Sequence, residues 1–318
     1  MRKLRKIVGW TFGIVVTFIV AILAYANYRV TKDEVNAFDA EAPGRYFTVQ
    51  GHRLHVRTFG DPALDPTGAP LMLVHGFLLS GHTSFLPWAR DELAPKRSLI
   101  LPDILGYGFS ERIPTPGEHY TLKSYARDLA GILDSLGIEK VDLSGHSWGG
   151  VLAAQFAHDY PNRVRRLVIV DGAFFFPEPT IVEKIVQLPL GIGRGFAWEM
   201  LAGGPASYSS LICRRQPECE GAPTLRIKDS TETMRAMMYT SRHSGGMKEL
   251  DAELAQITTP TLVLWGEKDP VVPVETGKRL ARELPSARLV VVKDALHAPW
   301  FQEPKETARQ LLDYLATP

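Results

Sequence analysis

The sequence predicts an α/β fold in which a mostly parallel, doubly wound sheet carries a helical lid inserted after the sixth strand. Short apolar runs, typical of strands buried on both faces of a parallel sheet, alternate with amphipathic helical segments along most of the 318 residues. This alternation stops between Asp171 and Thr259. Because that stretch is too long for a bare loop, we expect a small, mainly helical lid over the carboxyl edge of the sheet, where ligands bind in open α/β folds.

The expected elements follow one another in a regular order. A hairpin that turns at Gln50-Gly51 opens the fold, and Gly137 closes the first long amphipathic helix. Strands are expected at residues 45–49, 53–59, 71–74, 99–101, 141–143, 167–170, 262–265 and 289–292. Helices are expected at residues 122–136, 150–160, 276–283 and 305–315.

Three regions are expected along the chain. Residues 1–30 form an N-terminal transmembrane anchor or signal segment, residues 31–172 and 258–318 form the core, and residues 173–257 form the lid. Composition supports one large soluble domain behind the N-terminal segment. The formal net charge of +1 gives no reason to expect nucleic acid as a partner.

The N-terminal segment predicts attachment to a membrane. Residues 7–28 carry no charge, and at about 1.5 Å per helical residue they would span about 33 Å, enough for the hydrocarbon core of a bilayer. The basic residues before this run favour a cytoplasmic N-terminus and an extracytoplasmic catalytic domain. The alternative is a cleaved secretory signal, with Ala24-Tyr25-Ala26 as its cleavage site.

A candidate nucleophile lies in the motif Gly145-His146-Ser147-Trp148-Gly149. The motif follows the predicted strand 141–143 and precedes the predicted helix 150–160, which is the strand–turn–helix context of a nucleophile elbow. A serine there stands on a strained turn, and its flanking glycines allow the strand and helix backbones to approach closely. Ser147 is therefore the expected nucleophile.

A serine hydroxyl needs a base, and the base needs an acid to orient it and to stabilise its charged form. His297 follows the last predicted strand and is the expected base. Asp269, directly after the strand 262–265, is the expected acid; Asp171, at the end of the strand 167–170, is its main rival and Glu267 a more distant one.

The oxyanion of an attacked carbonyl needs preorganised N–H donors. We expect one donor from the backbone of Trp148, directly after the nucleophile, and the other from the backbone of Phe77 in the loop after the strand 71–74. His75 and His146 are interpreted as structural hydrogen-bonding residues. No cofactor or metal motif is evident, so neither is expected. Cys213 and Cys219 either close a small disulfide loop or remain free thiols.

Taken together, the motifs resemble those of the α/β-hydrolase superfamily, over residues 46–315. The resemblance is carried by His75-Gly76-Phe77, the D-x-x-G-x-G-x-S loop at residues 103–110, the Ser147 motif, residues 266–273 and His297. It implies a Ser-Asp-His triad of Ser147, Asp269 and His297, with Asp103 as a structural residue. It specifies the substrate poorly.

Departures from subfamily patterns narrow the choice of reaction. Ser147 stands where haloalkane dehalogenases and epoxide hydrolases carry an aspartate. Trp148, directly after the nucleophile, resembles the pattern of proline iminopeptidases. Their H-G-G-P-G segment is replaced here by His75-Gly76-Phe77-Leu78-Leu79, which weakens that resemblance. The same segment lacks the glycine-rich run typical of C–C bond hydrolases.

The expected function is that of a serine hydrolase cleaving carboxylic esters, a carboxylesterase or lipase-like enzyme that forms an acyl-enzyme. The alternatives are a proline iminopeptidase-like amide hydrolase and a cofactor-free haloperoxidase or perhydrolase. A non-catalytic binding protein is disfavoured because all three triad residues are present. The expected partner is a small-molecule ester. Apolar residues of the lid beside a membrane anchor are compatible with a lipid-derived ester, and the alternative is that most of these residues pack the lid onto the core.

Overall fold

The computed structural model describes residues 10–22, 24, 25, 28, 44–61, 68–77, 84–86, 88–111, 113, 118–175 and 246–317. The chain divides into two compact units, Met1–Ala40 with Pro179–Met238 and Glu41–Glu178 with Tyr239–Pro318. Most of the predicted lid, and both cysteines, lie outside the described residues. The lid and its boundaries therefore stay a prediction.

In the first unit, residues 10–22 are helical and their large apolar side chains are exposed. Across the part of the chain that the structure describes, no helix combines the length and the apolar character needed to cross a membrane. The structure thus gives no support to the predicted transmembrane anchor.

The second unit is built on a single sheet of eight strands within the described residues, in the order β1-β2-β4-β3-β5-β6-β7-β8. The strands are β1 (Arg45–Val49), β2 (His52–Phe59), β3 (Leu71–Val74), β4 (Leu99–Pro102), β5 (Val141–His146), β6 (Val164–Val170), β7 (Thr261–Gly266) and β8 (Ala287–Val292). β2 pairs antiparallel with β1 and with β4, and every other pairing is parallel. The predicted α/β class and the mostly parallel sheet are confirmed.

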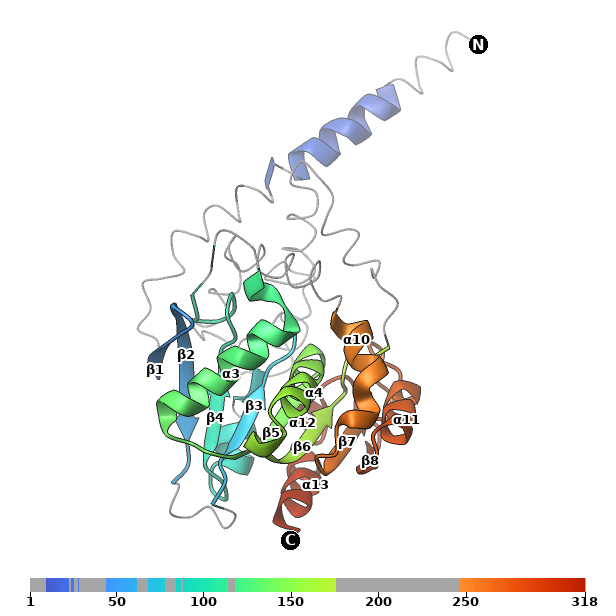
Figure 1. Ribbon diagram of the computed structural model, residues 1–318. Coiled ribbons are helices and arrows are strands. Elements are labelled where there is room, and N and C mark those ends of the chain that lie inside the picture. Colours follow the sequence, from blue (N-terminus) through green and yellow to red (C-terminus); the bar gives the residue numbers. More distant parts are fainter. Residues whose placement is uncertain are drawn as a thin grey trace. The chain divides into compact units, whose positions relative to one another are not determined.

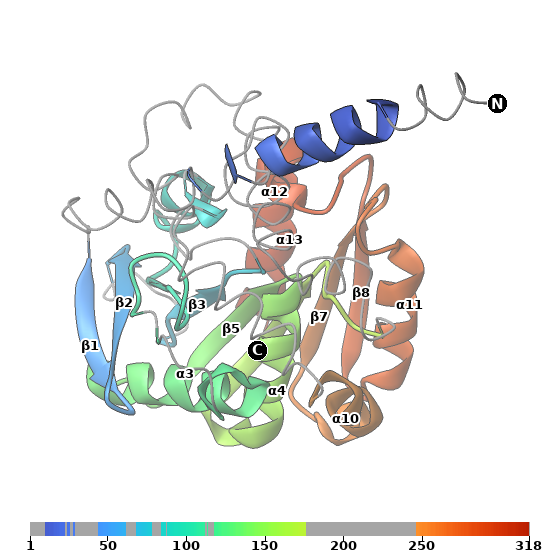
Figure 2. The ribbon, with the colours of Figure 1, turned by 90° about the horizontal axis from the view of Figure 1, so that it is seen from above.

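Helices cover both faces of this sheet (Figures 1 and 2). The α-helices are α3 (Leu122–Leu136), α4 (Trp148–Asp159), α10 (Gly246–Glu253), α11 (Val274–Glu283), α12 (Pro299–Gln302) and α13 (Pro304–Ala316). Shorter helical turns are η2 (Ala89–Leu93, a π-helix) and the 3₁₀ turns η3 (Glu118–Tyr120), η4 (Pro161–Arg163) and η7 (Leu254–Gln256). In Figure 2, α3 and α4 lie on one side of the strands and α12 and α13 on the other.

Successive side chains of a strand point to opposite faces of the sheet and pack into the apolar core on each side of it. Val168 and Val170 of β6 belong to one apolar cluster with Trp300 and Leu311 of the helices α12 and α13. Ile169, between them, points to the opposite face, where a Cβ placed at Gly150 of α4 would lie 3.1 Å from its methyl group. The period of two in the strand therefore buries both faces, as expected for a parallel sheet covered by helices.

The helix α3 begins and ends where the sequence predicts, because both of its caps are local. The Thr121 hydroxyl accepts a hydrogen bond from the Ser124 amide at 3.2 Å, and Gly137 takes the left-handed conformation with φ 69°. The strand β5, by contrast, continues three residues beyond the predicted end, to His146. Pairing with β3 and β6 extends it through Gly145, and no local pattern signals that pairing.

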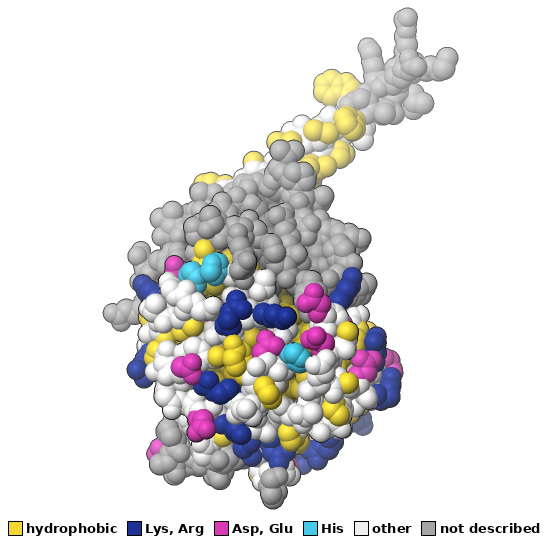
Figure 3. Space-filling view, viewed as in Figure 1, with side chains coloured by type: hydrophobic (Ala, Val, Ile, Leu, Met, Phe, Trp, Pro, Cys, Tyr) yellow, Lys and Arg dark blue, Asp and Glu magenta, His cyan; other side chains and the backbone are white. Residues whose placement is uncertain are grey.

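The charges on the visible face of the second unit are mixed. Basic and acidic side chains are interspersed there without a large patch of either sign (Figure 3). This distribution agrees with the formal net charge of +1.

Candidate active site

Ser147 lies at the sharp turn between β5 and α4. Its backbone has φ 53° and ψ −122°, a conformation that costs energy for a residue with a side chain. Its amide donates to the carbonyl oxygen of Val170 at 2.9 Å, which anchors the turn to the neighbouring strand. The turn is thus held in the strained form predicted for a nucleophile elbow.

The glycines around Ser147 are required by backbone contacts. A Cβ at Gly145 would overlap the carbonyl oxygen of Gly149, and a Cβ at Gly149 would overlap the carbonyl oxygens of Val74 and His75. Strand, turn and helix therefore approach each other at distances that only glycine permits. This close approach lifts the serine side chain away from the packed backbone.

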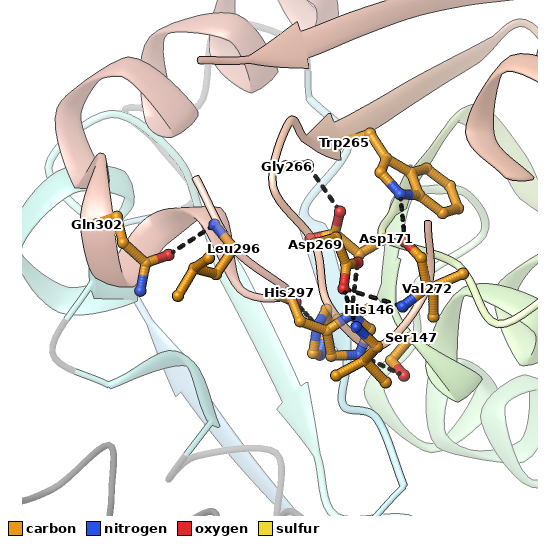
Figure 4. A network of polar contacts seen from close by, with 11 residues as sticks. His146, Ser147, Asp171, Trp265, Gly266, Asp269, Val272, Leu296, His297 and Gln302 are labelled. Carbon is orange, nitrogen blue, oxygen red and sulfur yellow. Dashed lines mark hydrogen bonds and ion pairs between the residues drawn. The ribbon is translucent and has the colours of Figure 1, made fainter. Parts of the chain in front are cut away.

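His297 lies between Ser147 and Asp269 (Figure 4). Its ring nitrogen Nε2 is 3.0 Å from Oγ of Ser147, and Nδ1 is 2.7 Å from Oδ2 of Asp269. A carboxylate accepts hydrogen bonds, so Nδ1 carries the proton and donates it to Asp269. The lone pair on Nε2 is then free to accept the hydroxyl proton of Ser147. His297 and Asp269 are both buried.

Asp269 is held by the loop that follows β7. Its Oδ1 accepts the backbone N–H groups of Val271 at 2.8 Å and of Val272 at 2.9 Å, while Oδ2 faces His297. The Trp265 indole N–H donates to the Val272 carbonyl oxygen at 3.0 Å and fixes the same loop to the strand. These two amides were not identified from the sequence. Pro270 and Pro273, which restrict the loop, were the available signal.

The other two acidic candidates have different surroundings. Asp171 is fully buried at the end of β6, and its Oδ1 accepts the Gly266 amide at 2.8 Å. Burial, and to a smaller extent the neighbouring Asp269, raise the pKa of Asp171 well above its usual range. Glu267 is exposed and accepts the Asp294 amide at 3.0 Å. Of the three acids, Asp269 is the one with a hydrogen bond to His297 among the described contacts.

The two expected oxyanion donors lie beside the turn. Trp148 is the first residue of α4, where helix geometry leaves the backbone N–H without an intrahelical acceptor. Phe77 follows Gly76, and a Cβ placed at Gly76 would lie 3.1 Å from Cβ of Ser147. The loop after β3 therefore passes directly against the serine. The roles of Phe77 and Trp148 as donors stay a prediction.

His75 and His146 hydrogen-bond to the backbone around the site. His75 bonds through Nδ1 to the Gly76 carbonyl oxygen at 2.9 Å and accepts the Ile104 amide through Nε2 at 3.2 Å. His146 donates through Nε2 to the carbonyl oxygen of His297 at 2.6 Å. Burial, followed by the charge of a protonated His297, lowers the pKa of His146 well below its usual range. Both imidazoles thus position loops of the site.

Asp103 has a similar positioning role in the loop after β4. Its Oδ2 accepts the Phe109 amide at 2.9 Å and bonds to Nδ1 of His55 at 2.9 Å. A Cβ at Gly108 would overlap this carboxylate. The contacts agree with the structural role expected for this aspartate.

One group of described residues has donor atoms close enough for a metal ion. A ring nitrogen of His146, a carboxylate oxygen of Asp171 and a ring nitrogen of His297 lie within 4.8 Å of one another. Both nitrogens of His297 already bond to Ser147 and Asp269, so a metal ligand there would break one of those bonds. The arrangement therefore suits proton transfer better than metal binding.

Comparisons with known proteins agree with this architecture. Residues 69–200 match a family model described as alpha/beta hydrolase fold, and residues 219–318 match one described as TAP-like protein. The chain is 32% identical to 2-hydroxy-6-oxo-2,4-heptadienoate hydrolase of Pseudomonas putida over 259 residues, which cover 78% of this chain and 90% of that protein.

Solved structures show the same likeness. A thermophilic esterase from Thermogutta terrifontis is 27% identical, with a TM-score of 0.62 over 86% of this chain and 98% of that one. An enol-lactonase from Burkholderia xenovorans superposes with a TM-score of 0.69 at 21% identity, over 86% of this chain and 100% of that one. The second likeness concerns the fold alone.

Proposed function

The chain belongs to the α/β-hydrolase family and is a hydrolase, and we propose that it cleaves carboxylic esters through an acyl-enzyme formed on Ser147. The observation that carries the proposal is the chain of contacts from Ser147 Oγ through both ring nitrogens of His297 to Asp269. This arrangement can move a proton from the hydroxyl to the imidazole while a carboxylate balances the new charge. The resemblance to an esterase supports an ester as the substrate.

In the proposed first half-reaction, Ser147 Oγ attacks the ester carbonyl carbon and its proton passes to Nε2 of His297. The resulting oxyanion accepts hydrogen bonds from the amides of Phe77 and Trp148. When the tetrahedral intermediate collapses, the C–O bond to the alcohol breaks and the leaving oxygen takes the proton from His297. Asp269 holds Nδ1 of the ring and stabilises the imidazolium between these two transfers.

The second half-reaction repeats the same steps with water. His297 accepts a proton from a water molecule as its oxygen attacks the acyl carbon of the ester on Ser147. Collapse of this second intermediate returns the proton to Oγ and releases the carboxylic acid. One imidazole therefore serves as base and acid in both halves, and the proposed reaction requires no cofactor.

A second candidate substrate class comes from the relative with 32% identity, whose name describes hydrolysis of 2-hydroxy-6-oxo-2,4-heptadienoate. That identity extends over most of both chains, so an unsaturated oxo acid of this type is a reasonable alternative to a simple ester. The segment from His75 to Leu79 lacks the glycine-rich run typical of C–C bond hydrolases, which is why the ester is preferred.

For the N-terminal segment we propose attachment to a membrane, with the second unit on the extracytoplasmic side. The support is the uncharged run of residues 7–28 behind four basic residues, together with exposed side chains such as Trp10, Phe12 and Phe18. A lipid-derived ester would then be a natural substrate. Cell fractionation of the full chain beside a chain lacking residues 1–30 tests this, since equal recovery of both in the soluble fraction would contradict it.

The function is tested by turnover of p-nitrophenyl esters of rising acyl length, with 2-hydroxy-6-oxo-2,4-heptadienoate as a separate substrate. Wild type is compared with Ser147→Ala and with Ser135→Ala, an exposed serine on α3 that serves as the matched control. We expect Ser147→Ala to lose at least about 10³-fold in kcat and Ser135→Ala to stay within about two-fold. Turnover of the oxo acid without any ester would replace the ester with the second candidate, and turnover that survives Ser147→Ala would refute the serine mechanism.

A further inference from the structure

A second buried carboxyl group lies inside the site beside Asp269. Asp171 follows β6, has no exposed surface, and adopts φ 47°, which is uncommon for a residue with a side chain. Its Oδ1 accepts the Gly266 amide, whereas its Oδ2 is buried without a hydrogen-bond partner. An unpartnered buried carboxyl oxygen is costly, so its presence here calls for a physical explanation.

The carboxyl of Asp171 lies near the imidazole that Asp269 holds. One of its oxygens, a ring nitrogen of His297 and a ring nitrogen of His146 lie within 4.8 Å of one another. Figure 4 draws Asp171 and Asp269 in the same part of the site as the rings of His146 and His297. A displacement of about 2 Å would bring Asp171 within hydrogen-bonding distance of that ring.

Asp171 and Asp269 interact electrostatically, and two such buried carboxylates cannot both ionise readily without a compensating charge. Burial and the charge of Asp269 raise the pKa of Asp171 well above its usual range, so Asp171 is the one of the pair that keeps its proton. In this state it is neutral, and Asp269 alone balances the imidazolium. The neutral form explains how Asp171 is tolerated beside Asp269.

We infer that Asp171 is a reserve acid, a positioning residue that takes over the orientation of His297 when Asp269 is neutralised. The inference rests on the proposed serine mechanism. Replacing Asp269 with asparagine removes the negative charge that opposes ionisation of Asp171. Burial still opposes ionisation of Asp171 in this variant, but the positive charge of the His297 imidazolium favours it. When Asp171 ionises, its proton passes to bulk water and its carboxylate becomes an anion beside that imidazolium. No bond other than that O–H bond is broken in this exchange.

The test is a double-mutant cycle of wild type, Asp269→Asn, Asp171→Asn and the double variant, measured as kcat/KM on a p-nitrophenyl ester from pH 5 to 9. Asparagine preserves the shape of each side chain and an oxygen that can accept the Gly266 amide. Asp269→Asn combined with Glu267→Gln is the matched control, because Glu267 is an exposed acid in the same loop.

We expect the Asp171→Asn change to cost at least about ten-fold more in the Asp269→Asn background than in wild type, a coupling of about 1.4 kcal/mol. The pH profile of Asp269→Asn should contain an ionisation that the double variant lacks, which a merely structural role of Asp171 would not produce. Equal losses from Asp171→Asn in both backgrounds, or a control as impaired as the double variant, would overturn the inference.

Failure of the proposed function is distinguished by a second readout. The rate at which a fluorophosphonate labels Ser147 reports the activated serine without requiring an ester substrate. Labelling that follows the same cycle in the absence of ester turnover would support the reserve acid and reject the esterase. Ester turnover without coupling between Asp171 and Asp269 would do the reverse.

Discussion

Gly149 illustrates how one residue position sets the geometry of the site. Its absent side chain leaves room for the carbonyl oxygens of Val74 and His75, at the start of the loop that carries Phe77. Gly150, the next residue, has more space, since a Cβ there would lie 3.1 Å from a methyl group of Ile169 and 3.2 Å from the backbone of Gly145 and Gly172. An added methyl group should therefore be tolerated less well at Gly149 than at Gly150, although both belong to the first turn of α4.

We expect Gly149→Ala to destabilise the fold by about 1–3 kcal/mol or more, because strand and helix backbones must separate. Activity should fall further than stability alone explains, because the loop before Phe77 is displaced. Gly150→Ala should cost less on both measures, since every atom near its Cβ position lies at 3.1 Å or more. Urea denaturation and kcat/KM of both variants check this, and equal effects of the two substitutions would show that the backbone contact is unimportant.

The choice of the acid that faces His297 also depends on single residues. The sequence predicted this choice only in part. Asp171 and Asp269 each follow a buried strand. The sequence therefore ranked Asp269 first as the acid but could not separate the two residues by their chemistry. The separation depends on how residues 266–273 fold: two amides of that loop turn Asp269 toward His297. Backbone hydrogen bonds from Glu267 to Val292 and from Lys268 to Ala295 hold the start of that loop, and contacts so distant in the sequence give no local signal.

Contacts between elements include a buried carboxyl outside the candidate site. Asp128 of α3 accepts a hydrogen bond from Gln50, in the turn between β1 and β2, at 2.7 Å. Burial raises the pKa of Asp128 to about 7, against the lowering effects of Gln50 and Arg127. The folded pKa thus lies above the unfolded value of 3.8. The folded state binds this proton more tightly, so the associated stability is complete below about pH 4 and is lost as pH rises toward 7.

We therefore expect Asp128→Asn to flatten the pH dependence of the free energy of unfolding between about pH 4 and 7. Above pH 7 the variant should be more stable than wild type by a few kcal/mol at most, since asparagine can still accept from Gln50 and carries no buried charge. Denaturation at pH 5, 6, 7 and 8 measures the difference. An advantage that is constant across this range would show that Asp128 does not titrate there.

At the element level, local signals were sufficient where they marked both ends of a segment. Thr121 and Gly137 define α3, and the short apolar runs locate the eight strands within a few residues. The four-residue helix α12 was missed because it is too short to show a periodic pattern. It matters to the core, where the Trp300 indole stacks on Trp88 at 5.5 Å between ring centroids.

At the scale of the whole molecule, the three residues proposed for catalysis come from distant parts of the sequence but belong to one unit. Ser147, Asp269 and His297 all follow strands of the parallel part of the sheet, so the fold itself brings them to its carboxyl edge. The order of strands and helices was enough to predict this convergence. Most of the predicted lid, at residues 173–257, lies outside the described part of the chain, so its part in substrate choice stays a prediction.

The most direct test of the central claim is covalent labelling of the intact protein by a fluorophosphonate, with the modified peptide located by mass spectrometry. We expect one label per chain, on Ser147. The label should be absent from Ser147→Ala and should form at least about 10²-fold more slowly in His297→Gln, which lacks the base. His158→Gln, a partly exposed histidine at the end of α4, should label at the wild-type rate. A label on another residue, or equal rates in wild type and His297→Gln, would contradict the assignment of Ser147 as a nucleophile activated by His297.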